Sequence, residues 1–214
     1  MISLPLFPLP VAVCPRELVP LHIFEMRYRD MIRDCRDQQE QGKAGEFIIT
    51  FFGTNGISSI GTVVKLVKVI KEYEDGRLDV IVVGRRRCRI AEAPSENTYR
   101  RGIPELLEDD RDDWNETLAT EAFNLHRALI QVVTGQAPGD ERYAGVAQLS
   151  FLLASTISIS HEAKQKLLEL PSEDERLMLL VGEMSVLMNH VEQVQLAARA
   201  IQGNWELQKI YGRT

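Results

Sequence analysis

The sequence predicts an α+β protein, in which a β-rich barrel or sandwich is followed by a helical bundle. Short apolar runs separated by turn residues fill residues 1–104, whereas from residue 115 apolar residues recur at steps of three and four. Charge divides the chain near the same place, because residues 1–104 hold 16 Lys and Arg against 13 Asp and Glu, and residues 105–214 hold 9 against 18. We therefore predict a β-rich domain over residues 1–110 and a helical domain over residues 114–210.

Two strands and a helix open the chain. Residues 2–7 are a short apolar run interrupted by prolines, which lack the N–H that an interior strand donates. Residues 18–23 form a second apolar run. The period then changes to that of one helix face, whose apolar residues are Phe24, Tyr28, Met31 and Cys35. The charged residues between them predict an amphipathic helix that ends before Gly42.

A hairpin organises the remaining strands. Asp75 and Gly76 suit a tight turn, because this pair accepts the positive φ angles that such a turn requires. Gly84 permits a bulge or bend in the strand that follows. The apolar and extended runs on either side predict strands at residues 47–52, 61–70, 78–83, 85–91 and 99–107.

The helical half begins after the charged run at residues 109–113. Asn115 is a suitable N-cap, and the apolar stripe behind it predicts a helix that is closed by residues 135–139. Ser172, with a glutamate three residues later, has the spacing of a capping box. It starts the longest helix, which we expect to end near Gly203. Two shorter helices are predicted between these, at residues 142–154 and 161–169.

Composition and motifs argue against several functions. The formal net charge of −6 and the lack of a broadly basic domain do not suit general DNA binding, which needs many cationic contacts with phosphate. No G-x-x-x-x-G-K-[ST] phosphate cradle is present. The four histidines are scattered without the spacing of zinc ligands, and no protease signature pairs a nucleophile with a base. We predict no catalytic residue, no metal and no cofactor.

The cysteines, the N-terminus and the longest uncharged stretch together indicate the cellular compartment. Cys14, Cys35 and Cys88 are odd in number, far apart and without a C-x-x-C motif, which fits buried thiols in a reducing compartment. The apolar N-terminus lacks the basic residues of a signal peptide. Residues 143–161 contain no Asp, Glu, Lys or Arg, but their many Ser, Thr, Gly and Ala residues favour core packing over a membrane span. We expect a cytoplasmic protein.

A series of short motifs resembles one known family. The motifs are, in order, Leu4-Pro5-Leu6-Phe7-Pro8, Pro20-Leu21-His22-Ile23-Phe24-Glu25, Arg27-Tyr28-Arg29, Gly61-Thr62-Val63, Asp75-Gly76-Arg77, Gly84, Arg87, Ile90, Lys164-Gln165-Lys166-Leu167-Leu168-Glu169 and Glu175-Arg176-Leu177. Together they resemble the N-terminal, substrate-binding domain of Lon proteases and the stand-alone Lon-like proteins. The resemblance extends over nearly the whole chain.

This resemblance implies a PUA-like β-domain followed by a helical bundle, with a role in recognising polypeptides or unfolded protein segments. Full-length Lon adds an ATPase module and a Ser–Lys protease module after this region, whereas this chain ends at Thr214. The resemblance therefore implies a non-catalytic binding module, such as an adaptor or regulator in protein quality control. The chain departs from the family at Met26, where Pro is usual, and at Arg16-Glu17, where the turn usually holds Gly. We expect small local changes of geometry there.

For polypeptide binding, the candidate residues are aromatic. They are Phe7, Phe24, Tyr28, Phe51 and Phe52, with Trp114 and Trp205 as further aromatic residues. An exposed edge of the β-domain could accept an extended peptide as an added strand. Alternatively, an apolar groove between the two halves could hold an unfolded segment.

The alternative function is RNA binding, because PUA-like folds also recognise RNA. On a strand, Arg85, Arg87 and Arg89 would share one face, and three guanidinium groups in a row could bind phosphate. The simpler interpretation is a solvated strand face balanced by the acidic residues 105–113.

His22, inside an apolar segment, is expected to be a core histidine that is hydrogen-bonded to the backbone.

Overall fold

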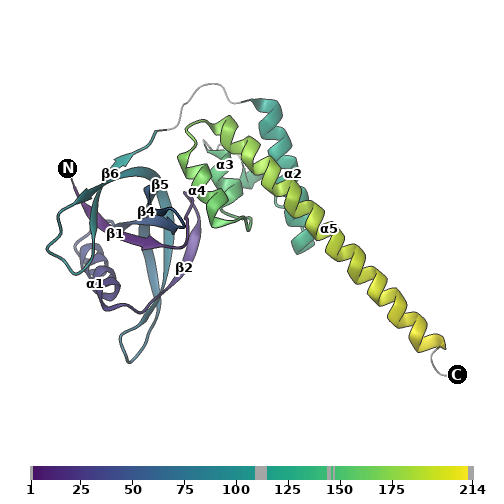
Figure 1. The fold of residues 1–214 in the computed structure, drawn as a ribbon, viewed down its shortest axis with the longest axis horizontal. Helices are drawn as coiled ribbons and strands as arrows, with labels where there is room; N and C mark the ends of the chain where they lie inside the picture. The colour runs from purple at the N-terminus through teal and green to yellow at the C-terminus, as the bar shows by residue number, and fades with distance from the viewer. Residues whose placement is uncertain (1, 109–114, 144–145, 147, 212–214) are drawn as a thin grey trace.

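The computed structural model describes residues 2–108, 115–143, 146 and 148–211, with side chains up to residue 202. A six-stranded mixed sheet and one helix form the first half, and further helices form the second (Figure 1). The predicted α+β class is confirmed. The charged run at residues 109–113 and Trp114 lie outside the described residues, as does the side chain of Trp205.

The sheet closes on itself, and one of its six strands lies outside the closed ring. Its strands are β1 (Leu4–Leu9), β2 (Leu18–Ile23), β3 (Glu46–Gly53), β4 (Gly56–Glu72), β5 (Leu78–Ala93) and β6 (Arg101–Leu106). Their order is β2-β5-β4-β3-β1-β6, and β6 returns to pair with β5. The first part of β5 pairs with β2, from Leu78 to Val83, and the second part pairs with β6, from Cys88 to Ala93. Five strands therefore close into a ring, and β2 extends the sheet beyond it.

Helix α1 (Met26–Glu40) covers the core of this ring. Its buried residues are Tyr28, Met31, Ile32 and Cys35, at the helical spacing that the sequence predicts. They join a core that includes Phe7, Phe47 and Val80. The helix begins at Met26, with Glu25 as its N-cap residue, so Phe24 lies before the helix rather than on its apolar face.

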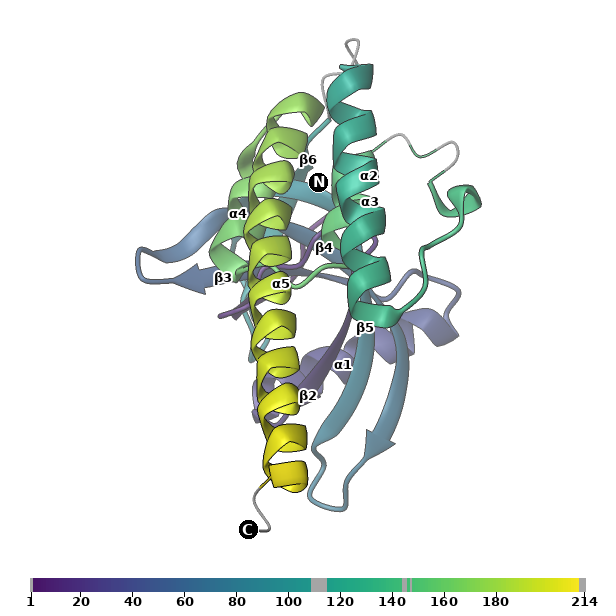
Figure 2. The same ribbon diagram turned by 90° about the vertical axis from the view of Figure 1, so that its right-hand side faces the viewer.

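The helical half consists of α2 (Glu116–Thr134), the 3₁₀ turn η1 (Asp140–Arg142), α3 (Leu149–Ala154), α4 (His161–Glu169) and α5 (Glu173–Tyr211). Helices α2 and α5 run side by side in the same direction (Figure 2), and the backbone N–H of Asn115 donates to Asp174 at the shared end. Asn115 caps α2, and Gly135 ends it with a φ of 81°. Both agree with the prediction. Helix α4 has the predicted bounds.

Two predicted helix bounds are wrong. The helix expected at residues 142–154 begins only at Leu149. Tertiary contacts determine this start, because Tyr143 bonds His126 of α2, and Glu173 of α5 accepts the N–H of Ser150 at 2.7 Å. Helix α5 continues through Gly203 to Tyr211 instead of stopping there. One glycine costs a helix only about 1 kcal/mol relative to alanine, and the Glu, Leu, Gln and Lys residues that follow favour helix.

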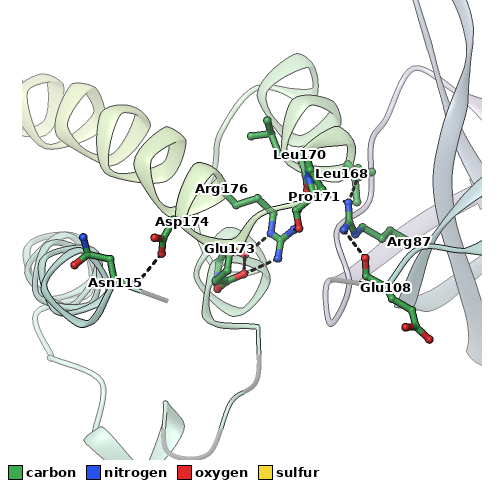
Figure 3. Close-up of polar contacts among 10 residues, drawn as sticks. Arg87, Glu108, Asn115, Leu168, Leu170, Pro171, Glu173, Asp174 and Arg176 are labelled. Atoms are coloured by element: carbon green, nitrogen blue, oxygen red, sulfur yellow. Dashed lines mark hydrogen bonds and ion pairs between the residues drawn. The ribbon is translucent and has the colours of Figure 1, made fainter. Parts of the chain in front are cut away.

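Backbone carbonyl groups join the two halves. Arg87 of β5 donates to the carbonyl oxygens of Leu168 at 3.0 Å and Leu170 at 2.9 Å (Figure 3). Arg176, whose side chain is fully buried, donates to the same Leu170 oxygen at 2.8 Å and forms an ion pair with Glu173 at 2.7 Å. These contacts place α4 and the start of α5 against the sheet.

Candidate functional site

Strand β2 forms an open edge of the sheet. Among the described residues it pairs only with β5. Gly84 exchanges backbone hydrogen bonds with Arg16 and Glu17, so by alternation Val19, Leu21 and Ile23 bond to β5. The backbone groups of Leu18, Pro20 and His22 then point to the open edge. This arrangement suits Pro20, which has no N–H to donate to β5.

The outer face of the sheet beside this edge carries apolar residues interspersed with the exposed lysines of β4. Leu18 is 63% exposed, and Val67 and Ile70 of β4 are 47% and 56% exposed. Partly buried Ile81 and Val83 of β5 lie between them, where Ile81 pairs with both Pro20 and Lys68. We call Leu18, Pro20, His22, Val67, Ile70, Ile81 and Val83 the edge-strand face. Adjacent exposed apolar side chains of this kind are typical of a binding surface.

In the ribbon view, β2 lies on the side of the sheet that faces the helical half, from which α5 extends away (Figure 1). Strand β2, which bears part of the edge-strand face, therefore lies on the same side of the sheet as the helical half. The edge of β2 is one of the two locations that the sequence suggests for a polypeptide, namely a sheet edge.

His22 does not lie in the core, and the expectation of a buried histidine is wrong. Its side chain is 44% exposed, and Nδ1 lies 2.6 Å from Oδ1 of Asp79 on β5. The hydroxyl of Tyr73 donates to the other oxygen of Asp79 at 2.7 Å. His22 alternates with the inward-facing Leu21 and Ile23, so the apolar composition of the segment did not predict its direction.

The hydrogen bonds among His22, Tyr73 and Asp79 shift the pKa values of two of these residues. The hydrogen bond from His22, with a second from Tyr73, lowers the pKa of Asp79. The same bond to Asp79 raises the pKa of Tyr73. A histidine held by an aspartate can act as a base, and covalent catalysis would also need a nucleophile. Among the described residues, His22 is within hydrogen-bonding distance of no serine, threonine or cysteine side chain. The geometry suits recognition of a hydrogen-bonding group.

The five predicted aromatic residues do not form one patch. Phe7 and Tyr28 are buried against each other, with ring centroids 3.9 Å apart. Phe51 is half-buried, whereas Phe24 and Phe52 are 62% and 53% exposed. Phe52 pairs with Ile57 at the start of β4. Phe24 follows Ile23, and Ile23 pairs with Leu78, which in turn pairs with the last residue of β4. The two exposed phenylalanines therefore lie near opposite ends of β4. Only Phe24 adjoins the edge-strand face, where its ring lies 6.3 Å from that of His22.

Sequence reasoning missed Leu18, Val67 and Ile70. The signal was present in part, because lysines are interspersed among the apolar residues of residues 61–70. Val67 follows buried Leu66 and faces outward by ordinary alternation. Ile70 faces outward because the register shift that follows Leu66 changes the alternation.

The predicted row of three arginines is not formed. Arg85 and Arg89 are exposed, but Arg87 is 3% exposed and bonds the carbonyl groups of the helical half. A register shift beside Gly84 changes the alternation, since Val64 pairs with Gly84 and Val63 with Arg86. The guanidinium group of Arg87 is therefore part of the junction (Figure 3) and is not available to phosphate.

The remaining chemistry is equally limited in the described part of the chain. There, no three His, Cys, Asp or Glu side chains are arranged to hold a metal ion. The three cysteines are free and buried, and burial raises the pKa of Cys35 and of Cys88 to about 12, so their thiols are poor nucleophiles. Each described helix is too short or too polar to cross a lipid bilayer.

Known proteins resemble this chain along most of its length. A family model described as the ATP-dependent protease La (LON) substrate-binding domain matches residues 3–186. The Lon protease of Flavobacterium johnsoniae is 28% identical over 144 residues, which cover 64% of this chain and 18% of that protein. The chain thus spans less than a fifth of the length of that relative.

Two solved structures are similar. The crystal structure of a Lon N-terminal domain protein from Xanthomonas campestris has a TM-score of 0.62 and 26% identity, covering 85% of this chain and 98% of its own. The N-terminal domain of the Mycobacterium avium complex Lon protease has a TM-score of 0.68 and 21% identity, covering 86% and 98%. The second likeness supports the fold alone.

Proposed function

This chain belongs to the ATP-dependent protease La (LON) substrate-binding domain family, and we propose on that basis that it binds unfolded polypeptide segments at the edge-strand face. The observation that carries the proposal is the open edge of β2 beside exposed Leu18, Val67 and Ile70. Within the chain, we propose that residues 1–110 form the binding domain and that residues 114–210 form a second domain.

The chemistry of an open edge explains how one surface can bind many sequences. An extended segment would add beside β2 and hydrogen-bond with the outward backbone groups of Leu18 and His22 and the carbonyl of Pro20. These bonds do not depend on the side chains of the segment. Alternate side chains of the segment would contact the apolar residues of the outer face, so binding would favour unfolded chains that expose apolar residues.

We propose that these residues bind without changing covalent bonds, as an adaptor or regulator in protein quality control. The surface offers an open strand edge and apolar contacts, and the described thiols are buried. Three free cysteines also support a reducing, cytoplasmic location.

The experiment is fluorescence anisotropy with a fluorescein-labelled, carboxymethylated unfolded protein. Leu18→Lys and Val67→Lys should each raise the Kd about tenfold, because a charge replaces an apolar contact. Val133→Lys is the matched control, since Val133 of α2 is 64% exposed against 63% for Leu18 but lies outside the face. Equal affinity of all three variants and the parent protein would overturn the proposal.

A second arm tests the added strand. A short apolar peptide with N-methyl groups on alternate residues cannot donate hydrogen bonds from one of its edges. It should bind at least about tenfold more weakly than the unmethylated peptide. If methylation has no effect while Leu18→Lys does, the segment lies on the face but does not extend the sheet.

A further inference from the structure

A separate cavity of about 270 Å³ lies between α1 and the end of the β4–β5 hairpin. Arg29, Arg33 and Arg36 line it from α1, at a spacing that places them on one helix face. Gly76 and Leu78 line it from the hairpin. The cavity thus combines three guanidinium groups with an apolar side chain, and neither the edge-strand face nor the junction uses these residues.

The arginines are only partly neutralised. Arg33 pairs with Asp30 at 3.1 Å and Arg36 with Glu72 at 3.4 Å, and the side chains of both arginines are largely exposed. Arg29 donates to the backbone oxygen of Asp75 at 2.5 Å, a neutral acceptor. The lining therefore holds three guanidinium groups and two carboxylates. Exposed ion pairs of this kind are weak, so an incoming anion can compete for the same arginines.

The hairpin turn places Gly76 beside the guanidinium group of Arg29. Gly76 has a φ of 81°, and a Cβ atom there would lie 2.7 Å from Nη1 of Arg29. A glycine thus leaves room for the guanidinium group against the turn. The rim of the cavity is apolar, because Met26 is 68% exposed and directly precedes the arginine-bearing turn of α1.

We propose that this cavity binds a carboxylate of the captured polypeptide, with the neighbouring apolar side chain of that polypeptide against Met26. An excess of one positive charge fits a monoanion, and guanidinium groups bind carboxylates in bidentate geometry. The volume lies below the roughly 300–1,000 Å³ typical of small-molecule sites, which suits one residue at the end of a chain. The inference rests on the proposed function, because Phe24 connects this cavity to the edge-strand face along the chain.

The test compares three fluorescein-labelled peptides of the same apolar sequence. One ends in leucine with a free carboxylate, one ends in leucine amide, and one ends in glutamate amide. The free acid should bind about tenfold more tightly than the leucine amide. Tight binding of the glutamate amide as well would identify any carboxylate as the ligand, whereas weak binding would restrict the site to the chain terminus.

Variants locate the effect. The double variant Arg33→Gln, Arg36→Gln should remove the advantage of the free acid and leave the affinity for the amide unchanged. Glu72→Gln should increase the advantage, because Arg36 loses its competing carboxylate. Arg100→Gln is the matched control, since Arg100 pairs with Glu92 at the same 3.4 Å between exposed side chains but does not line the cavity.

Failure of this inference is distinct from failure of the proposed function. If free acid and amide bind equally well and Leu18→Lys weakens both, the cavity is not a carboxylate site but the edge-strand face still binds polypeptide. Inorganic phosphate at millimolar concentration should compete only weakly. If phosphate displaces the free acid while free acetate does not, the cavity selects phosphate, and the proposal is overturned.

Discussion

Arg87 and Arg176 donate hydrogen bonds to the same carbonyl oxygen, that of Leu170, at 2.9 Å and 2.8 Å (Figure 3). One arginine comes from β5 in the sheet and the other from α5 in the helical half. Leu170 lies in the short link between α4 and α5. This carbonyl oxygen thus accepts from one donor of the sheet and one donor of the bundle, and both donors are charged.

Arg87→Met should destabilise the protein by about 2–4 kcal/mol, because a buried charged donor is lost and the carbonyl groups of Leu168 and Leu170 lose partners. Urea unfolding followed by circular dichroism measures this change. Arg89→Met is the control on the same strand, because Arg89 is exposed. Equal midpoints for the two variants would mean that the junction contributes little.

Glu173→Gln should cost about 3–5 kcal/mol, since the fully buried guanidinium of Arg176 would lose its counter-charge. Asp174→Asn changes the next carboxylate in the same helical turn, which among the described residues accepts the exposed N–H of Asn115, and should cost under about 1 kcal/mol. Thermal unfolding of the two variants gives the comparison. A larger loss for Asp174→Asn would contradict the assignment.

Acid should destabilise the protein through His126. Burial lowers the pKa of this histidine to about 4 from its usual 6.5, and its two ring nitrogens already bond Tyr143 and Thr156. The unfolded chain takes up a proton below pH 6.5 and the folded protein does so only near pH 4. Stability therefore falls as pH drops through this window, by about 3 kcal/mol in total.

Urea unfolding at several pH values measures this fall. His126→Gln should be less stable at neutral pH and show a flatter profile between pH 6.5 and 4. His190→Gln, at an exposed position, should keep the parent profile. An unchanged slope in His126→Gln would assign the acid sensitivity to other groups.

Arg16→Gly should stabilise the protein by up to about 1 kcal/mol. Arg16 has a φ of 71°, a conformation that costs a residue with a side chain about 1–2 kcal/mol, partly offset by the greater freedom of glycine in the unfolded chain. Gly42→Ala is the reciprocal change, with a φ of 76° and open space around it, and should destabilise by a similar amount. Differential scanning calorimetry compares the two, and a lower Tm for Arg16→Gly would refute the argument.

Much of the fold follows from local sequence. Asn115 and Gly135 bound α2 because each supplies the chemistry that its end of the helix requires, a side-chain acceptor and a positive φ. The bounds of β2 and α4 follow from changes in apolar period. The prediction failed at the start of α3, where a carboxylate from α5 determines the first turn, since such a contact is not visible in local sequence.

The candidate site was less predictable. Phe7 and Tyr28 are aromatic, as recognition residues often are, but they pack in the core. The direction of Arg87 depends on a register shift of one residue, which reverses the faces of the strand that follows. The open edge of β2 depends on strand order, which no segment specifies alone. Pro20 was the available signal, because a proline inside a strand points to an edge.

The far part of α5 has a consequence for how the protein melts. The side chains of residues 192–202 are all exposed, so this stretch depends on intrinsic helix propensity, which is marginal for short helices in water. It can fray and re-form while the packed core stays intact. Loss of far-ultraviolet ellipticity would then begin before the near-ultraviolet signal changes, and heat unfolding of the chain would not be a single cooperative step.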